Sequence, residues 1–357
     1  MSRQKKAISD CSQLKEDLRT AIDVLPRVKL AHLPTPLEEA PRLSEMLGGP
    51  RILFKRDDLT GLPLSGNKTR MFEFSLAEAI DQGAEIVVQS NAAQSNYSRQ
   101  LAVACAKLGL QAHLVLRKAR GEKDLSVQGN LLLDLLAGAK VELVDADVSE
   151  QPKLKKQKVE ELRKKGHKVY EARGTDRDTA IEAVAYVNCA LELYGQLEEM
   201  KIEPTYLFVS AHDTTQAGLL VGAKYLGASF QVRGINMFND DSKGLITNIG
   251  NDIIALLGLD MNISVNEVIN TTDYVGEGYG IPTQEGLEAI KLVARTEGVF
   301  LDPVYTSKAM VGLIDYINQG EIGKDETVVF LHTGGFPSLF AYNKELEAAM
   351  DEKPVIR

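Results

Sequence analysis

A glycine-containing turn that leads directly into a helical pattern places one lysine in a chemically unusual position. The segment FKRDDLTGLPLSGNKTRMFEF (54–74) brings Ser65-Gly66-Asn67-Lys68 to the start of an apolar helical pattern. Lys68 is therefore predicted in the first turn of a helix, where the positive end of the helix dipole disfavours a protonated amine. A neutral amine is what imine chemistry requires. A surface lysine in a loop is the alternative, and spacing alone favours that alternative.

Polar side chains also follow the predicted strand AEIVVQS (84–90). The run is Asn91-Ala92-Ala93-Gln94-Ser95-Asn96-Tyr97-Ser98-Arg99-Gln100. So many hydrogen-bonding groups, at the point where a strand leads into a helix, can orient a polar ligand. The alternative is that Ser95 or Asn96 simply caps the helix, and the sequence alone does not separate the two.

A further junction has the features of an oxyanion-binding loop. It reads Val209-Ser210-Ala211-His212-Asp213-Thr214-Thr215-Gln216-Ala217-Gly218. Threonine hydroxyls and free backbone N–H groups at a helix N-terminus bind phosphate well. Capping by Asp213 or Thr214 is the alternative, and both interpretations stay open at this point.

Two tyrosines and a pair of glycines complete the set of candidate residues. Tyr279 lies between Gly278 and Gly280, which lets it project from a tight turn, and Tyr305 lies in DPVYTSK (302–308). A phenol can act as an acid or hold a ligand, although most tyrosines are packing residues. The segment HTGGFP (332–337) allows close approach of backbone to a ligand, and a plain turn would explain it equally well.

Alternating strand and helix patterns must position these residues. The first series predicts strands at 84–90, 111–117, 140–146 and 167–172, with helices at 98–109, 125–139 and 150–165. After a long helix at 177–199, the second series predicts strands at 205–211, 229–238, 299–305 and 326–332. Its helices are expected near 214–226, 243–258, 284–297, 307–318 and 338–349. This rhythm is typical of parallel sheets, which bind ligands at the carboxyl ends of their strands and in the cleft between lobes.

The composition excludes several classes of function. The chain has 357 residues, 44% hydrophobic and 25% charged, as in a folded globular protein. The net charge of −9 argues against a nucleic-acid partner, and the basic stretch 153–165 has the Lys/Glu spacing of a solvated helix face. The sequence has no long apolar run and no apolar region near the N-terminus. It therefore predicts neither export nor a membrane span.

The cysteines and histidines exclude further kinds of site. Cys11, Cys105 and Cys189 are too few and too unevenly placed for a disulfide framework, so a reducing, cytoplasmic setting is expected. The five histidines show no HxxxH or HExxH pairing, so no metal site is expected. No GxGxxG follows the first strand, which argues against a nucleotide-binding dehydrogenase.

Taken together, these segments resemble the fold type II pyridoxal-phosphate enzymes, in the branch that holds D-cysteine desulfhydrase and 1-aminocyclopropane-1-carboxylate deaminase. The resemblance extends from LPTPLEEAPRLSEMLG (33–48) to HTGGFPSLFAY (332–342). Six segments stand in the same order, namely KRDDLTGLPLSGNKTR, QSNYSRQLAVACAKLG, SAHDTTQAGL, GYGIPTQEGLEAIKLVARTEG, DPVYTSKAM and HTGGFPSLFAY. Any one of them alone would be weak evidence.

The resemblance implies an α/β fold like that of the tryptophan synthase β subunit. Two open, twisted and mostly parallel sheets are flanked by helices, and the active site lies in the cleft between two domains. The expected large, cofactor-binding domain comprises 1–60 and 176–357, and the small α/β domain comprises 61–175. A homodimer is implied as well.

The resemblance also assigns roles to single residues. Lys68 would hold the cofactor aldehyde as a Schiff base and then act as base or acid. Ser95, Tyr279 and Tyr305 would be catalytic and, together with Gln94, Asn96 and Tyr97, would contact a small amino-acid substrate, with Gln94 and Tyr97 beside its carboxylate. Cofactor contacts fall on Asn67, Asn96, Ala211, His212, Asp213, Thr214, Thr215 and Thr333, of which Thr215 and the 211–214 backbone would hold the phosphate and Asn96 the phenolic oxygen.

A difference within the family favours one reaction over another. Where the deaminase branch has a glutamate after DPVY, this chain has Thr306, and the HTGG segment supplies Thr333. A neutral hydroxyl cannot keep the pyridine nitrogen protonated, which weakens the electron sink. We therefore expect α,β-elimination from a small β-substituted amino acid, with D-cysteine as the central substrate and cysteate as a further one, giving pyruvate and ammonia. The alternatives are a ring-opening deaminase and a catalytically inactive relative that binds an amino acid.

The chain also departs from the family pattern near the phosphate. Met71 stands where the family has a phosphate-binding lysine, and His212-Asp213 stand where small residues are usual. A carboxylate about 4 Å from a phosphate charge costs on the order of 4 kcal/mol at an effective dielectric near 20. Asp213 is therefore expected to turn outward as a cap or to hold His212, and a protonated His212 is expected to replace part of the missing lysine charge.

Overall fold

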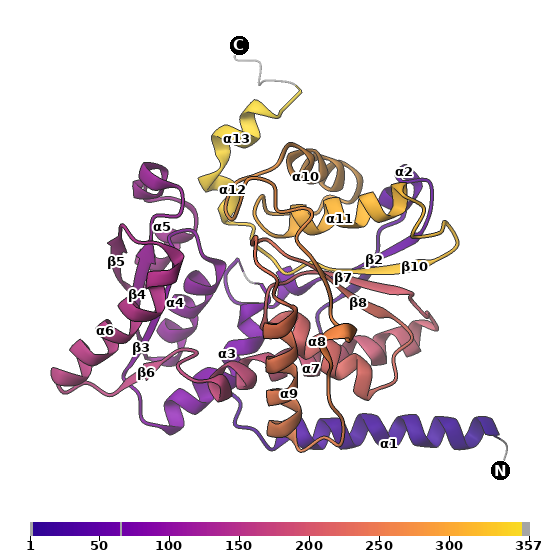
Figure 1. The fold of residues 1–357 in the computed structure, drawn as a ribbon, viewed down its shortest axis with the longest axis horizontal. Coiled ribbons are helices and arrows are strands. Elements are labelled where there is room, and N and C mark those ends of the chain that lie inside the picture. Colours follow the sequence, from indigo (N-terminus) through magenta and orange to yellow (C-terminus); the bar gives the residue numbers. More distant parts are fainter. Residues whose placement is uncertain (1–2, 65, 352–357) are drawn as a thin grey trace.

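The smaller sheet of the protein is entirely parallel (Figure 1). The computed structural model describes residues 3–64 and 66–351. The strand order of the smaller sheet is β5-β4-β3-β6. Its strands are β3 (Ile86–Ala92), β4 (Gln111–Arg117), β5 (Lys140–Val144) and β6 (Val169–Glu171).

Helices cover both faces of this sheet because successive strand residues point to opposite sides. Val87 packs with the helices α4 (Asn96–Leu108) and α5 (Gly129–Leu136), whereas Ile86 and Val88 pack against α6 (Gln151–Lys164). The Ser95 side chain caps α4, and Gly109 ends this helix at a φ of 75°, a conformation that favours glycine. Both ends of α4 are therefore encoded locally.

The larger sheet has six strands in the order β1-β2-β10-β7-β8-β9. All neighbouring pairs are parallel except β1 with β2. The strands are β1 (Leu37–Glu39), β2 (Arg51–Lys55), β7 (Tyr206–Ser210), β8 (Gln231–Ile235), β9 (Ile269–Thr271) and β10 (Thr327–Leu331). Two mostly parallel, helix-flanked sheets confirm the predicted α/β class.

Two helical layers enclose the larger sheet. Leu207 and Val209 of β7 face one core, whereas Phe208 faces the other. The first layer contains α1 (Arg3–Asp23), α7 (Asp176–Met200), α8 (Thr214–Tyr225) and α9 (Lys243–Leu257). The second contains α2 (Pro41–Met46), α10 (Gln284–Glu297) and α11 (Thr306–Asn318), with the short α12 (Ser338–Ala341) and α13 (Asn343–Ala348) after β10.

Glycines set the position of α8, whose N-terminus follows β7. A Cβ atom at Gly218 would lie 2.3 Å from the carbonyl oxygen of Ala183, and one at Gly222 would lie 2.5 Å from the Cβ of Ala190. Both neighbours belong to α7, so α8 can lie this close to α7 only with glycine at these positions. Short 3₁₀ helices occupy Asp57–Leu59, Gly121–Leu125, Val148–Glu150 and Val265–Glu267.

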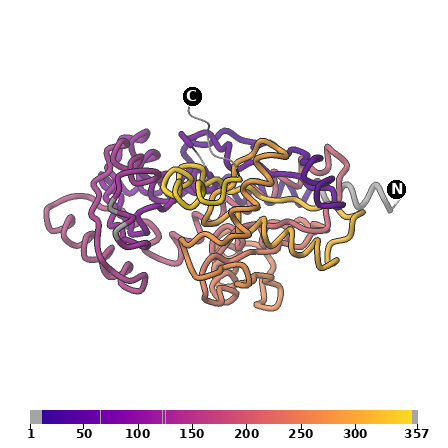
Figure 2. Tube along the Cα trace, turned by 90° about the horizontal axis from the view of Figure 1, so that it is seen from above, coloured from indigo at the N-terminus to yellow at the C-terminus, as the bar shows by residue number. Residues whose placement is uncertain are grey.

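The chain crosses twice between the small part, which is built on the smaller sheet, and the large part, which is built on the larger sheet. Strands β3–β6 all fall within 61–175 and the other strands lie outside it, in keeping with the predicted division, although the exact boundaries stay a prediction. Figure 2 shows the C-terminal segment, in yellow, lying between the two parts. There Arg120 of the small part stacks on the Tyr342 ring at 3.9 Å.

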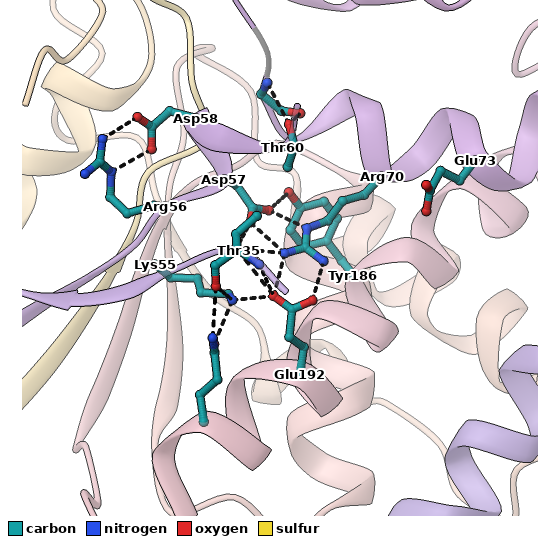
Figure 3. A network of polar contacts seen from close by, with 12 residues as sticks. Thr35, Lys55, Arg56, Asp57, Asp58, Thr60, Arg70, Glu73, Tyr186 and Glu192 are labelled. Atoms are coloured by element: carbon teal, nitrogen blue, oxygen red, sulfur yellow. Dashed lines mark hydrogen bonds and ion pairs between the residues drawn. The ribbon is translucent and has the colours of Figure 1, made fainter. Parts of the chain in front are cut away.

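A buried polar network fastens α3 (Lys68–Asp81) to the larger sheet (Figure 3). Arg70 is 1% exposed and donates to both oxygens of Asp57 and of Glu192 at 2.8–2.9 Å. Tyr186 donates to Asp57 at 2.6 Å, and Lys55 donates to Glu192. Because Arg70 lies two residues after Lys68, this network fixes the helix end that carries the candidate lysine.

One predicted strand is wrong, and three strands were not predicted. Residues 299–305 form no strand, because Pro303 has no N–H to donate and the Asp302 carboxylate instead accepts the backbone N–H groups of Val304, Tyr305 and Thr306 at 2.8–3.0 Å. The strands β1, β2 and β9 lie outside the predicted set. Two of them have only three residues, too few for a periodic pattern.

Candidate active site

A cavity of about 200 Å³ lies between the two sheets, at the carboxyl ends of their strands. We call it the cleft cavity. Its wall contains residues from each of the polar junctions that the sequence singled out. The predicted residues that line it are Asn67, Lys68, Ser95, Asn96, Tyr97, Ala211, His212, Asp213, Thr215, Tyr279, Tyr305 and Thr333.

Lys68 is the first residue of α3 and is half-buried in the cavity wall. The turn before it approaches the HTGG segment closely. The backbone N–H of Asn67 donates to the carbonyl of Thr333 at 3.0 Å, and a Cβ atom at Gly66 would lie 2.8 Å from that same oxygen. Burial lowers the pKa of Lys68 to about 8, although the Asp213 carboxylate opposes the shift. Ser65 of the predicted turn lies outside the described residues.

Asp213 is the N-cap of α8 and pairs with an arginine that the sequence analysis missed. Its carboxylate accepts the Thr214 N–H at 2.5 Å and pairs with Arg173 at 2.9 Å. Burial would raise the pKa of Asp213, but Arg173 and Lys68 outweigh it and hold this pKa well below its usual value. The expected capping role of Asp213 is confirmed, but its side chain lines the cavity and does not turn outward. The alternative that Asp213 holds His212 is wrong, because His212 lies 2.9 Å from Asp240 instead.

Arg173 joins a buried carboxylate, that of Glu182, to a half-buried one, that of Asp213. It bonds to Glu182 at 2.6 Å as well as to Asp213, and its guanidinium lies 4.9 Å from the Tyr97 ring centroid. Burial lowers the pKa of Arg173, but the two carboxylates outweigh burial and raise it. Arg173 lies two residues after the end of β6, so the rule that ligands bind after strands could have found it.

Tyr97 lines the cavity, but its hydroxyl is already engaged. It donates to Glu182 at 2.5 Å, and burial together with that carboxylate raises the pKa of Tyr97 well above its usual value. Ser95 both caps α4, by accepting the Ser98 N–H at 3.3 Å, and lines the cavity. For Ser95, the capping and the ligand interpretations are thus compatible.

Tyr279 and Tyr305 face each other in the cavity wall with their hydroxyl oxygens 2.6 Å apart. The Tyr279 ring also stacks on Phe238, with ring centroids 4.6 Å apart. Burial raises the pKa of both phenols. Both therefore stay protonated at neutral pH and can pass a proton between them.

Two predicted site residues, Gln94 and Thr214, do not line the cavity, and neither does Thr306. The Gln94 side chain instead bonds to the backbone of Gln128 and Asn130, and Thr214 is buried against Arg173. Thr306 is fully buried and donates to Asp302 at 2.7 Å, so of the two threonines near the HTGG and DPVY segments only Thr333 borders the cavity.

Comparison with known proteins agrees with this geometry. A model of the family described as "Pyridoxal-phosphate dependent enzyme" matches residues 28–334. The chain belongs to this family. The match confirms the predicted fold type and cofactor and makes the chain a pyridoxal-phosphate-dependent enzyme.

Curated relatives and solved structures support the assignment. The chain is 38% identical over 323 residues to a D-cysteine desulfhydrase of Salmonella typhi, covering 89% of this chain and 96% of the relative. It is 37% identical to a D-cysteine desulfhydrase of Klebsiella pneumoniae over 90% of this chain and 97% of the relative. The crystal structure of an ACC deaminase homologue matches with a TM-score of 0.83 and 32% identity, over 94% of this chain and 99% of that one.

More distant structures share the fold alone. The apo diaminopropionate ammonia lyase of Escherichia coli matches with a TM-score of 0.66 at 14% identity, over 94% of this chain and 90% of that one.

The residues of the cleft cavity fit the cofactor of this pyridoxal-phosphate-dependent enzyme. The hydroxyl of Ser210 is buried without a hydrogen-bond partner and borders the cavity beside Thr215, at the N-terminus of α8 where a phosphate is well bound. The Asn96 Oδ1 accepts from Asn130 at 2.9 Å, which leaves the amide NH₂ of Asn96 as a donor. Amine, phosphate site and amide donor thus border one cavity.

The described part of the chain offers neither a metal-binding cluster nor a membrane-spanning helix. Within residues 3–64 and 66–351, no cluster of three or more His, Cys, Asp or Glu side chains could hold a metal ion. Within the same ranges, every helix is too short or too polar to cross a bilayer.

Proposed function

We propose that this enzyme is a lyase that eliminates a β-substituent from a small amino acid such as D-cysteine, releasing pyruvate, ammonia and the leaving group. The observation that carries the proposal is the state of charge of the cleft cavity. Among its described lining residues Asp213 is the single carboxylate, and it is paired with Arg173. The HTGG end of the cavity presents the neutral Thr333, which favours elimination over opening of a cyclopropane ring.

The roles of the residues follow from their positions. When bound, pyridoxal phosphate withdraws electrons from the Cα atom of an amino acid. Lys68 accepts the Cα proton, for which a pKa of about 8 is well placed. Ser95 and Asn96, at the N-terminus of α4, orient the substrate, and the hydroxyl pair of Tyr279 and Tyr305 donates a proton to the leaving group.

The phosphate contacts fall on the N-terminus of α8. Thr215, whose hydroxyl accepts from Asn67 at 3.1 Å, and the backbone from Ala211 to Thr214 hold the phosphate. His212 adds positive charge when protonated and is oriented by Asp240. A His212→Ala variant should therefore bind the cofactor more weakly in a fluorescence titration, and unchanged affinity would exclude this role.

A screen for keto-acid release tests the reaction. The substrates are D-cysteine, L-cysteine, cysteate, β-chloroalanine, serine and the cyclopropane amino acid. We expect pyruvate from at least one β-substituted alanine. Release of 2-oxobutyrate from the cyclopropane acid, with no pyruvate from the others, would show a deaminase instead.

The role of Lys68 has its own test. The enzyme mixed with pyridoxal phosphate should turn yellow, and borohydride should then fix the cofactor covalently to the wild type but not to a Lys68→Ala variant. A wild-type protein that stays colourless with excess cofactor would contradict the proposal, since an inactive amino-acid-binding relative behaves in that way.

Assembly and location complete the proposal. The resemblance to fold type II enzymes supports a homodimer, which sedimentation analysis tests. A reducing, cytoplasmic setting is supported by Cys105 and Cys189, which are free and buried, and burial raises the pKa of each thiol to about 12.

A further inference from the structure

Arg117 places an uncompensated positive charge in the wall of the cleft cavity. It is the last residue of β4, is half-buried and pairs in register with Ala92, which also lines the cavity. Its Nε atom is buried without a hydrogen-bond partner, and its guanidinium lies 5.8 Å from the Tyr279 ring centroid. Within the described chain no carboxylate forms an ion pair with it.

Gln151 provides a second unused donor in the same wall. It is the first residue of α6, and its Nε2 atom is buried without a hydrogen-bond partner. The nearby carboxylate of Glu150 is engaged, since it accepts the backbone N–H of Asp147 at 2.9 Å. A guanidinium from β4 and an amide NH₂ from α6 thus border the cavity, and neither has an acceptor.

The contrast with Arg173 shows what these groups require. Arg173 borders the same cavity, but Asp213 and Glu182 neutralise it. Burying an unpaired charge costs free energy unless a partner arrives. No residue of the described chain pairs with the half-buried Arg117, so a bound anion with oxygen acceptors fits this position.

The other anionic groups of a bound amino acid already have sites. The reacting Cα must lie near Lys68, whose amine takes its proton. The N-terminus of α4, at Ser95 and Asn96, suits the α-carboxylate, and the N-terminus of α8 suits the cofactor phosphate. The remaining anion is therefore on the substrate side chain.

We propose that Arg117 and Gln151 form a subsite for an oxyanion on the substrate β-carbon, a sulfonate or a phosphate ester, which then leaves in the elimination. This inference rests on the proposed function and names its substrate class. With a sulfonate, the Cα proton goes to Lys68, the Cβ–S bond breaks and its electron pair leaves with sulfur as sulfite. The enamine that remains takes up one water and gives pyruvate and ammonia, so no oxidant or reductant is needed.

Two substrates that differ in the charge of the leaving group test the subsite in the holoenzyme. Cysteate and O-phosphoserine carry an oxyanion, whereas β-chloroalanine does not. We expect Arg117→Met to lower kcat/KM about 100-fold for an oxyanion substrate, mainly through KM, and to change it less than about 3-fold for β-chloroalanine. Arg117→Lys, which keeps the charge, should restore part of the loss.

A binding measurement separates recognition from catalysis. 3-Sulfopropanoate has the carboxylate and sulfonate of cysteate but no amine, so it binds without reacting. Calorimetry should show its Kd rising about 100-fold in Arg117→Met, with a smaller rise in Gln151→Leu. The matched control is Arg233→Met, because Arg233 also has a buried, unpartnered Nε and lies on tyrosine rings, but it does not border the cavity.

The outcomes are distinguishable. An unchanged Kd for 3-sulfopropanoate in Arg117→Met overturns the subsite. An equal loss for β-chloroalanine and cysteate also overturns it, because Arg117 would then bind the α-carboxylate. A wild type that binds 3-sulfopropanoate but releases pyruvate from no substrate overturns the proposed elimination and not the anion site. If Arg117→Met does not fold, Arg117→Lys and Gln151→Leu carry the same comparison.

Discussion

Single residues in the cleft cavity differ in how their charge is compensated. Burial lowers the pKa of Lys68 to about 8, and the carboxylate of Asp213 is stabilised by Arg173. Arg117 has no ionic partner in the described chain. Reactivity follows from these differences, because a neutral amine accepts protons and an unpaired guanidinium attracts an anion.

Lys68 should make the stability of the apoprotein depend on pH. Its pKa in the folded protein, about 8, lies below its usual 10.5. Burial of the protonated Lys68 amine therefore lowers the free energy of unfolding below pH 8. This destabilisation disappears as the pH rises toward 10.5. Lys68→Met should stabilise the cofactor-free protein at pH 7 by up to about 3 kcal/mol, with the gain shrinking above pH 8. Urea unfolding across this pH range measures it, and a gain independent of pH would contradict the assignment.

Arg173 should support cofactor binding through Asp213. Arg173→Met leaves the buried Glu182 and the half-buried Asp213 without their arginine, so we expect weaker cofactor affinity by at least about 10-fold and a less stable fold. Adding Asp213→Asn removes one of those charges and should recover part of the affinity. Fluorescence titration of the single and double variants measures the coupling, and strictly additive effects would argue against it.

Among the elements, α3 depends most on buried polar contacts. Lys68 is the first residue of α3, and Arg70 lies two residues after it. The ion pairs of Arg70 connect α3 to the 3₁₀ turn at Asp57 and to α7 at Glu192 (Figure 3). Local helix propensity alone could not hold its N-terminus to a fraction of an ångström. The position of Lys68 therefore depends on contacts among α3, the 3₁₀ turn at Asp57 and α7.

Removing one member of this network should be costly. Asp57→Ala removes two of the acceptor oxygens of the buried Arg70, which keeps Glu192, and leaves the Tyr186 hydroxyl without its acceptor, so we expect a loss of about 3–5 kcal/mol in unfolding free energy. Glu39→Ala breaks an ion pair with Arg51 whose side chains are 43% and 47% exposed, and it should cost less than about 1 kcal/mol. Urea denaturation compares the two, and similar losses would show that the network adds little.

At the scale of the whole molecule, the C-terminal segment connects the two parts that form the cavity. Tyr342 stacks under Arg120 of the small part and donates to the carbonyl of Gly280 at 2.7 Å. Gly280 adjoins Tyr279, so the chain end supports a wall of the site from outside it. Figure 2 shows this segment between the two parts.

Loss of this support should reduce activity without touching the reacting groups. Tyr342→Ala removes both contacts and should lower kcat/KM by about 10-fold, because Tyr279 is then less well positioned. Lys123→Ala, which breaks an exposed ion pair with Glu345 in the same region, should leave kcat/KM unchanged. Equal activity of Tyr342→Ala and the wild type would refute the role of the chain end.

The sequence by itself determined most of the order of the strands and helices, the mostly parallel character of the sheets and the junctions at which polar residues gather. These features depend on local periodicity and on helix capping, and both signals can be recognised within about ten consecutive residues. The α4 junction and the turn before Lys68 were found for that reason.

Only the tertiary structure decided which charges are paired. Arg173 and Asp213 lie 40 residues apart, and Tyr97 and Glu182 lie 85 apart, so no local pattern joins them. Thr306 is a different case, because its partner Asp302 lies only four residues before it, and this local hydrogen bond keeps Thr306 out of the cavity. Pairing of buried charges depends on the packing of distant elements, and this is why Arg173 and Arg117 emerged from the fold and not from a motif.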